Sequence, residues 1–374
     1  MGNNYDLFIV HGAIQFNKRT AFQRTKAGFC SRRKRRRAKP AVAAGYGAAP
    51  HSKGRMMGLT QTKSTAQLKS KPQWILDFKN YWRYRYLMLL FIPGIVWFII
   101  FRYVPIYGLT LAFRDFSFRA GIRGSEWVGL DHFRWLFSLP GFWNVFRNTV
   151  IINVYQLVFG FPAPIIFAIL LNEMVHLRFK KLVQTISYMP FFLSWVILAG
   201  IMVQILSPST GVVNLLLRSI GMEPIFFLGN PRYFRGVLVV SNIWRTVGWS
   251  SIIYLAALAN VDVEMYEAAR MDGASKLKEI WHITLPSIAN VITIMLILRA
   301  GSMLADNFDQ IFNLLNPAVF EVGDVLATYT FRLGLRNMEY SMATAVGLFT
   351  NVISFALVIF ANAVSKKFND YGIW

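Results

Sequence analysis

One charged segment, MYEAARMDGASKLKEIWHITLP (residues 265–286), lies between two long apolar runs and holds the first candidates for a functional site. Small alanines would leave a helix with a thin side that another protein surface can approach closely, and flanking charges would offer that surface anchors. The residues with these properties are Glu267, Ala268, Ala269, Arg270 and Asp272. The segment therefore predicts a docking surface, and a solvated loop between two apolar runs is the alternative.

Local propensity predicts a helix-turn-helix for this segment. Residues 263–271 are rich in alanine and glutamate and read as a short helix, with Asp262 or Asn260 as the N-cap. Gly273 suits the left-handed position that follows a helix, and Ser275 can cap a second helix. The apolar helix that follows is expected to begin or bend at a proline, because an N-terminal proline costs the helix no hydrogen bond.

Other familiar chemistries find little support. The five histidines are scattered without ligand spacing, which argues against a metal site, and the single cysteine, Cys30, excludes an internal disulfide. The chain contains no GxxxxGK[ST] phosphate loop, and no nucleophile, base and orienting group recur at a recognisable spacing. A membrane enzyme is therefore disfavoured, and we expect this chain itself to bind no cofactor.

Ionisable and polar residues inside apolar stretches are the second set of candidates, because each charge costs about 2.5 to 3.5 kcal/mol to insert into a membrane. Asn242, Arg245 and Trp249 fall at i, i+3 and i+7, on one helical face, and Arg299 lies in the next stretch. An amide, a cation and an aromatic ring are what a saccharide or sugar acid needs. A structural Arg299–Asp306 pair, or pairing of Arg245 with an acid of a partner subunit, is the alternative.

Composition indicates that membrane-spanning helices position these residues. The 374 residues are 55% hydrophobic and 16% charged, against about 25% charged in soluble proteins. A hydrocarbon core of about 30 Å requires about 20 helical residues. Six segments meet this length, and none shows the alternation of a β-barrel. The predicted spans are 86–107, 150–171, 182–206, 236–259, 286–304 and 342–364.

Lysine distribution predicts the orientation of the spans. All eight lysines from residue 71 onward fall on one side of a six-span arrangement, and by the positive-inside rule this side is the cytoplasm. Both termini are then cytoplasmic. The outer loops are roughly 108–149, 207–235 and 305–341, and the largest inner loop, 260–285, contains the charged segment.

Residues 1–70 form a basic tail that is predicted to be disordered. They hold 15 Lys and Arg against Asp6 alone, which supplies +14 of the formal charge of +22. A nucleic-acid patch and a segment attracted to anionic lipid are two functional interpretations. A third is that the protein starts at Met56 or Met57. A soluble nucleic-acid-binding protein is excluded by the spans, so we expect no nucleic-acid partner.

The spacing within the charged segment resembles a known family. The EAA motif of binding-protein-dependent ABC importers has the pattern EAA, three residues, Gly, nine residues, then Ile-x-Leu-Pro. This chain matches it with Glu267, Ala268, Ala269, Gly273, Ile283, Leu285 and Pro286. The stretches YLMLLFIPGIVWFIIFRYVPIYG and YSMATAVGLFTNVISFALVIFANAVSKKFNDYGIW resemble polysaccharide-type permeases of bacterial carbohydrate importers. The resemblance covers about residues 80–374.

The resemblance implies an all-α, multi-pass permease of the bacterial cytoplasmic membrane that moves an oligosaccharide by alternating access. The motif residues would form a coupling helix seated in a cytoplasmic ATPase subunit, with Gly273 setting the angle of the push on the fifth span. ATP and Mg²⁺ would lie on separate ATPase subunits. The other implied partners are a second permease subunit, expected to form a heterodimer with this chain, an extracytoplasmic binding protein and membrane lipid. A non-sugar solute such as a peptide or phosphate, and a channel or receptor without an ATPase, are the alternatives.

Overall fold

A computed structural model describes residues 85–304 and 307–369. The predicted basic tail, 1–70, and Asp306 lie outside these residues. The described part is almost entirely helical, and its β-structure is one antiparallel pair of two-residue strands, β1 (Arg114–Asp115) and β2 (Glu126–Trp127). The predicted all-α class is therefore confirmed.

Four helices of the described part are long and apolar enough to cross a membrane, and two bent helix pairs can each supply one more. A polytopic membrane protein with up to six spans is consistent with these lengths. The segments are Leu89–Phe113, Pro140–Asn172, Leu177–Phe192 with Trp195–Ile205, Pro231–Leu258 with Val263–Met271, Lys276–Ser302 and Tyr340–Lys367.

The first of these segments is predominantly apolar. It consists of α3 (Arg85–Phe98), a π-helical turn η1 (Ile99–Tyr103) and a 3-10 helix η2 (Val104–Phe113). Large hydrophobic side chains along all three are exposed, and η2 packs against the C-terminal helix α18 (Tyr340–Asn369). Such a surface is compatible with lipid or another membrane subunit.

The second segment contains a π-helical turn immediately before a proline. Helix α6 (Pro140–Tyr155) continues into the turn η3 (Gln156–Gly160) and then into α7 (Pro162–Asn172). The amide of Phe161 bonds to the carbonyl of Gln156, five residues earlier, at 3.1 Å. The next residue, a proline, has no amide hydrogen to donate, and the widened turn accommodates its ring without ending the helix.

The segment predicted as a single span over 182–206 is broken in the structure. Helix α8 (Leu177–Tyr188) and a short 3-10 turn η4 (Met189–Phe192) are separated by a 107° bend from α9 (Trp195–Ile205). Two residues at the break are extended, and the second, Ser194, caps α9 by accepting a hydrogen bond from the Ile197 amide at 3.4 Å. The prediction missed the bend because it treated the proline in η4 as tolerable within a helix, although a proline and a capping serine together favour a break.

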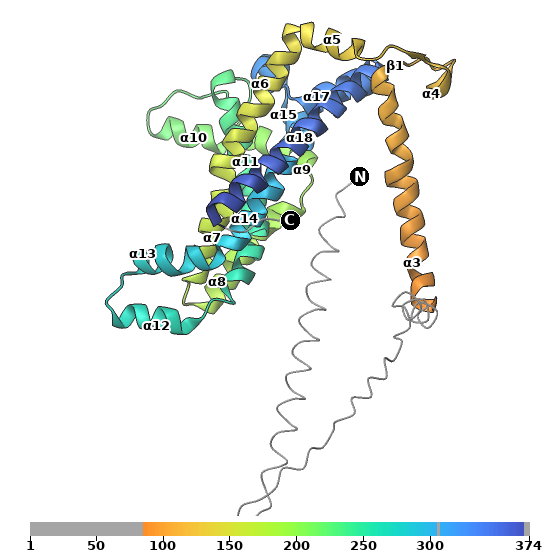
Figure 1. The fold of residues 1–374 in the computed structure, drawn as a ribbon. Coiled ribbons are helices and arrows are strands. Elements are labelled where there is room, and N and C mark those ends of the chain that lie inside the picture. Colours follow the sequence, from red (N-terminus) through yellow and green to blue (C-terminus); the bar gives the residue numbers. More distant parts are fainter. Residues whose placement is uncertain (1–84, 305–306, 370–374) are drawn as a thin grey trace, which may run out of the picture. The chain divides into compact units, whose positions relative to one another are not determined.

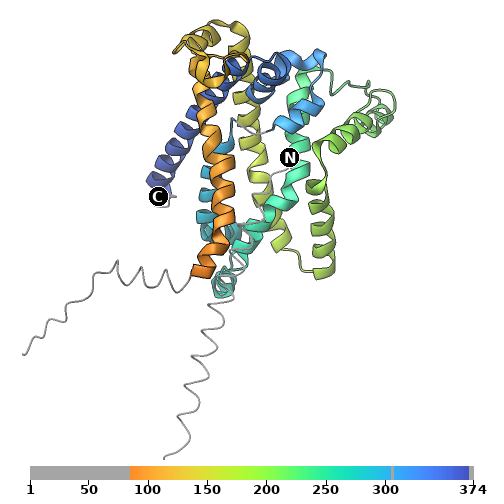
Figure 2. The same cartoon turned by 90° about the vertical axis from the view of Figure 1, so that its right-hand side faces the viewer.

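Helix α11 (Pro231–Leu258) is the central element of the described part. It packs against α7, α8 and α14 (Leu285–Ser302), as Figures 1 and 2 allow the reader to follow. It contributes to two of the hydrophobic clusters, through Phe234 and Leu238 in one and through Tyr254 and Leu258 in another. A side chain at Gly248 would collide with the carbonyl of Ser187, so α8 and α11 approach closely at this point.

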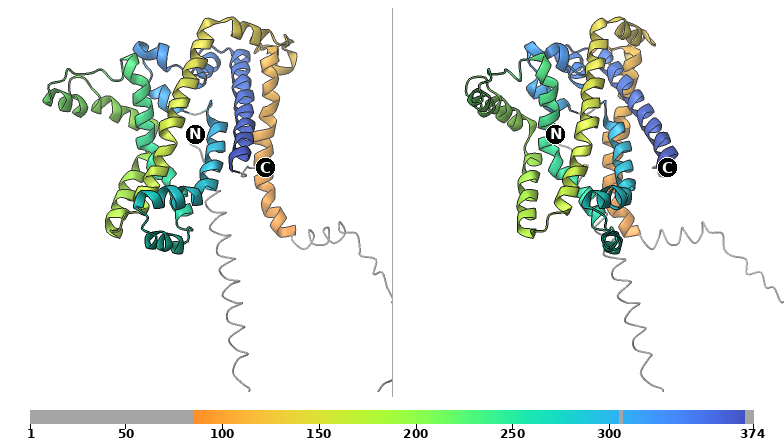
Figure 3. Two further views of the ribbon diagram at one scale, coloured as in Figure 1. Left: turned by 60° about the vertical axis from the view of Figure 1, so that its left-hand side comes forward. Right: turned by 90° about the vertical axis from the view of Figure 1, so that its left-hand side faces the viewer.

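The remaining elements lie at the two ends of the bundle formed by α6, α7, α11 and α14 (Figures 1 and 3). One end carries the polar helix-turn-helix α12 (Val263–Met271) and α13 (Lys276–Glu279), followed by the π-helical turn η5 (Ile280–Thr284), which leads into α14. The other end carries α4 (Gly121–Gly124), α5 (Asp131–Ser138), η6 (Pro317–Val319), α16 (Phe320–Gly323), α17 (Leu326–Phe331) and η7 (Arg332–Arg336). Two further short helices lie in the connections between longer helices. They are α10 (Val212–Ser219), which follows α9, and α15 (Phe308–Leu314), which follows α14.

Candidate coupling and transport sites

The helix predicted for residues 263–271 is present as α12, and its ends are made by the residues expected to cap it. The carboxylate of Asp262 accepts a hydrogen bond from the Glu264 amide at 3.0 Å. At the other end Gly273 has a φ of 75°, which favours glycine. The amide of Ala274 then returns to the carbonyl of Ala269 at 2.9 Å, which closes the turn.

The motif residues of α12 face outward. Glu267 and Ala268 are exposed, Ala269 is half-buried, and no residue of the helix is buried. Exposed apolar side chains accompany them, and the most exposed is Met271 at 89%. The exposed surface of α12 therefore combines a small alanine, an acidic side chain and apolar side chains. It lies at the end of the bundle, where a partner protein can contact it.

The C-terminal part of the motif lies in a helix that runs without a sharp bend from Lys276 to Ser302. Pro286 is the second residue of α14, as expected for a helix that begins at this proline, although no sharp bend separates α14 from the helical turns before it. The π-helical turn η5, in which the Leu285 amide bonds to the Ile280 carbonyl, comes just before the proline and accommodates it. Ile283 is half-buried, and Leu285 packs against the hydrophobic cluster that contains Tyr254 and Leu258.

Polar contacts connect α12 to the helix that follows it, and the sequence did not predict them. The Tyr266 hydroxyl lies 3.0 Å from the Thr284 hydroxyl, and Arg270 Nε donates to Glu279 Oε1 at 3.0 Å. Arg270 was expected to anchor a partner, but its guanidinium is engaged within the segment. To predict this pair from the sequence, one would have to know how the helices before and after the turn are rotated relative to each other.

The three residues predicted to share a face of α11 divide between two neighbours. Asn242 Nδ2 donates to Gln156 Oε1 at 2.8 Å, which ties it to η3. The Trp249 ring stacks on Phe191 with 4.7 Å between ring centroids and 5° between their planes. Arg245 and Trp249 thus converge on the break between α8 and α9, whereas Asn242 points to the second segment.

Arg245 lies among aromatic rings and retains donor capacity. Its guanidinium carbon is 5.3 Å from the centroid of the Phe191 ring and 5.1 Å from that of Trp195. Its hydrogen bond from Nη2 to the Phe191 carbonyl is long, at 3.5 Å, and its buried Nε atom has no hydrogen-bond partner among the described residues. A buried cationic donor without an acceptor can bind an anionic or hydroxyl oxygen.

The other candidate, Arg299, lies half-buried in the last turn of α14. Its alternative structural partner, Asp306, is outside the described residues, so the pairing stays a prediction. Arg245 and Arg299 both lie in apolar stretches of the sequence. The structure places Arg245 beside the aromatic rings of Phe191 and Trp195.

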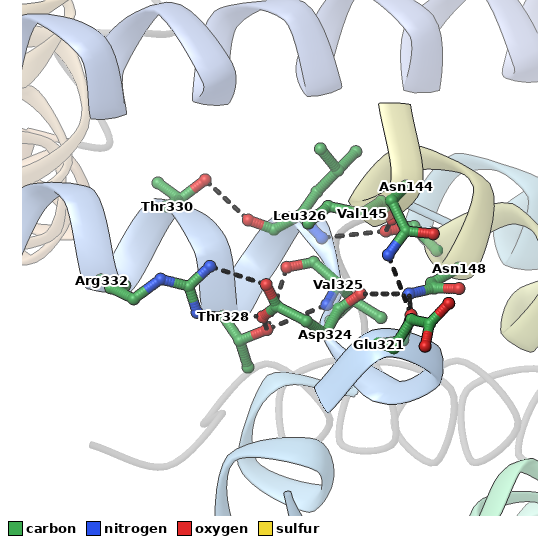
Figure 4. A network of polar contacts seen from close by, with 11 residues as sticks. Asn144, Val145, Asn148, Glu321, Asp324, Val325, Leu326, Thr328, Thr330 and Arg332 are labelled. Atoms are coloured by element: carbon green, nitrogen blue, oxygen red, sulfur yellow. Dashed lines mark hydrogen bonds and ion pairs between the residues drawn. The ribbon is translucent and has the colours of Figure 1, made fainter. Parts of the chain in front are cut away.

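A second polar network, which the sequence did not reveal, lies at the other end of the bundle (Figure 4). Asp324 is 2% exposed and receives two hydrogen bonds from Arg332, the shorter at 2.6 Å. Asn148 on α6 donates to the carbonyls of Glu321 and Asp324, at 2.7 and 3.2 Å. Arg235 on α11 donates to Asn148 Oδ1 at 2.8 Å. The network fixes α16 and α17 to α6 and α11 through contacts more than 70 residues apart in the sequence.

Comparison with known proteins places the chain among transport permeases. Residues 160–370 match the family described as binding-protein-dependent transport system inner membrane component. The chain is 44% identical to the polygalacturonan/rhamnogalacturonan transport system permease protein YteP of Bacillus subtilis (strain 168), over 78% of this chain and 90% of the relative. It is 43% identical to protein LplB of the same organism, over 78% of this chain and 92% of the relative.

A solved structure agrees with these relatives. It is the crystal structure of a bacterial ABC transporter involved in the import of the acidic polysaccharide alginate. The match has a TM-score of 0.73 and 41% sequence identity, and it covers 78% of this chain and 99% of that chain. The chain belongs to the family of binding-protein-dependent transport system inner membrane components.

Proposed function

We propose that this chain is the permease subunit of an ATP-driven importer that moves acidic oligosaccharides across the cytoplasmic membrane by alternating access. The single observation that carries the coupling part of the proposal is α12, a capped helix that presents Glu267, Ala268 and a left-handed Gly273 at one end of the bundle. Rigid attachment to the adjoining helix lets a displacement of α12 reach the membrane-spanning part.

ATP hydrolysis belongs to separate subunits in this proposal. ATPase subunits that bind ATP and Mg²⁺ receive α12 in a surface cleft, and closure of the two ATPase subunits displaces the helix. Ile283, Leu285 and Pro286 form the transition from the cytoplasmic turn to α14, so they carry the displacement into the fifth span. In this proposal the chain transmits the movement, and the ATPase subunits supply the free energy of ATP hydrolysis.

The other partners follow from the family and the charge distribution. A second permease subunit, different from this chain, completes the pathway, and membrane lipid surrounds it. The lysine distribution supports an orientation with both termini in the cytoplasm. A binding protein delivers substrate on the outer side, which is supported by a matching alginate transporter structure in complex with an alginate pentasaccharide-bound periplasmic protein.

Acidic substrate is supported by the surroundings of Arg245. The Trp249–Phe191 stack offers apolar faces to the C–H side of a sugar ring, and Arg245 beside it retains a donor for a carboxylate. The names of two relatives agree, since one transports polygalacturonan, a polymer of a sugar acid, and the other is involved in import of acidic alginate. Asn242 and Arg299 would contribute further donors along the pathway.

Uptake in a deletion strain tests this proposal. We expect the strain that expresses the wild-type chain to take up labelled acidic oligosaccharides in preference to neutral ones of the same length, and not to take up peptides or phosphate. Arg245→Gln should reduce the preference for the acidic sugar, whereas Arg232→Gln, which removes an exposed arginine at the start of the same helix, should leave it unchanged. Equal uptake of acidic and neutral sugars by the wild type would contradict the acidic assignment.

A further inference from the structure

The cytoplasmic helix-turn-helix contains one buried side chain, and it is an acid. No residue of α12 is buried, and in α13 the buried residue is Glu279, at 2% exposure. It lies where α13 passes into the π-helical turn η5, inside the nine-residue interval of the EAA pattern. Burial of a carboxylate is unfavourable unless charged donors satisfy it, so its neighbours determine what it does.

Both oxygens of Glu279 are occupied by cations from two sides of the turn. Arg270, in the last turn of α12, donates through Nε to Oε1 at 3.0 Å and through Nη2 to Oε2 at 3.5 Å. Lys276, at the start of α13, donates to Oε2 at 3.1 Å. Arg270 precedes Gly273 in the sequence and Glu279 follows it. The ion pair between them therefore bridges the turn through side chains, in addition to the backbone conformation that Gly273 provides.

The same cluster extends to another membrane-spanning segment. Lys276 Nζ also lies 2.8 Å from Glu173 Oε2, and Glu173 is the C-terminal cap of α7. The charged side chains therefore alternate in sign from α12 to the end of α7. Their order is Arg270, Glu279, Lys276 and Glu173. The hydroxyl contact between Tyr266 and Thr284 lies between the same two helices.

We propose that Glu279 is the positioning residue for coupling: it locks α12 to the α13–α14 helix and, through Lys276, to the end of α7. Exposed ion pairs contribute little to stability, but here three charge-assisted hydrogen bonds from two cations converge on one covered carboxylate. The paired state is thus favoured over a hinged one, and the displacement of α12 reaches two spans as a rigid-body movement. This inference rests on the proposed function, since only an ATP-driven transporter has coupling to lose.

The test measures substrate transported per ATP hydrolysed, with the complete complex reconstituted in proteoliposomes. Glu279→Ala should lower this ratio several-fold, and Glu279→Gln should lower it less, because the amide keeps one acceptor oxygen. Lys276→Ala should have a smaller effect than Glu279→Ala, because Arg270 still closes the turn. Glu223→Gln, an exposed acid outside the coupling segment, serves as the matched charge control.

Rescue separates positioning from a general loss of stability. In a Cys30→Ser background, Arg270→Cys with Glu279→Cys removes the ion pair, and a short bismaleimide then links the two positions covalently. We expect the double variant to be uncoupled and the linker to restore the ratio. A normal ratio in Glu279→Ala, or a reduced ratio that the linker leaves unchanged, would overturn the positioning role.

Three outcomes of the experiment remain distinguishable. Reduced recovery of complex with a normal ratio per folded complex would assign Glu279 to stability alone and overturn the inference. Absence of ATP-driven uptake in the wild type would instead contradict the proposed function. Normal coupling in the wild type and in every variant would leave the proposed function standing and reject the inference.

Discussion

Substitutions of Gly273 provide a graded perturbation of the turn between α12 and α13. The φ of Gly273, 75°, is unfavourable for residues with a Cβ atom, yet a Cβ added there would meet nothing within 4 Å. A substitution therefore changes the backbone preference of the turn without creating a steric clash. Few positions in the described part of the chain separate these two effects so cleanly.

The expected magnitudes follow from that geometry. Alanine in the left-handed region costs about 1–2 kcal/mol, which corresponds to about a 5- to 30-fold shift away from the native turn. Asparagine tolerates this region and should cost less. Proline cannot adopt the required φ, and it removes the amide that donates to the Arg270 carbonyl at 3.1 Å, so it should cost the most.

The assay compares transport per ATP hydrolysed for Gly273→Asn, Gly273→Ala and Gly273→Pro in the reconstituted complex, with the amount of folded complex measured by size-exclusion chromatography. We expect the ratio to fall in that order while membrane insertion stays normal. Gly236→Ala is the control, because this glycine lies in the helical part of α11 and an added Cβ there also meets nothing within 4 Å. Normal coupling in the proline variant would show that transport does not require the left-handed turn at Gly273.

Three further predictions concern other parts of the chain. Glu267→Lys should abolish ATP-driven uptake while leaving membrane insertion intact, and normal uptake by this variant would count against docking through α12. Gly248→Ala should destabilise the permease by about 1–3 kcal/mol because the added methyl group collides with the Ser187 carbonyl, and a melting curve identical to that of the wild type would contradict this packing. Arg332→Ala leaves the buried Asp324 carboxylate without its charged partner and should cost about 3–5 kcal/mol, which thermal unfolding in detergent can measure; unchanged stability would show that the network contributes little.

Features specified by neighbouring residues could be predicted from the sequence. Asp262 and Gly273 define the ends of α12, because a capping side chain and a left-handed glycine act within one turn of the helix. The long apolar stretches were found because their length matches a bilayer. The break at Ser194 was missed because a proline within an apolar stretch is compatible with both a continuous helix and a broken one.

Features that depend on distant contacts could not be predicted. Arg270 and Glu279 meet only when the turn between them has its native angle, and Asn148 meets Arg235 only after α6 packs on α11. The helical face shared by Asn242, Arg245 and Trp249 was evident from spacing, but their neighbours were not. The substrate and coupling roles of the individual residues stay predictions that the proposed experiments test.

We propose that α12 couples an ATPase to sugar transport through this chain. The measurement that tests it most directly is uptake of a labelled acidic oligosaccharide into proteoliposomes that contain the complete complex, with and without ATP on the side of the ATPase. We expect uptake that requires ATP and that stops when the Glu267→Lys variant replaces the wild-type chain. Uptake that continues without ATP or without the ATPase subunits would contradict it.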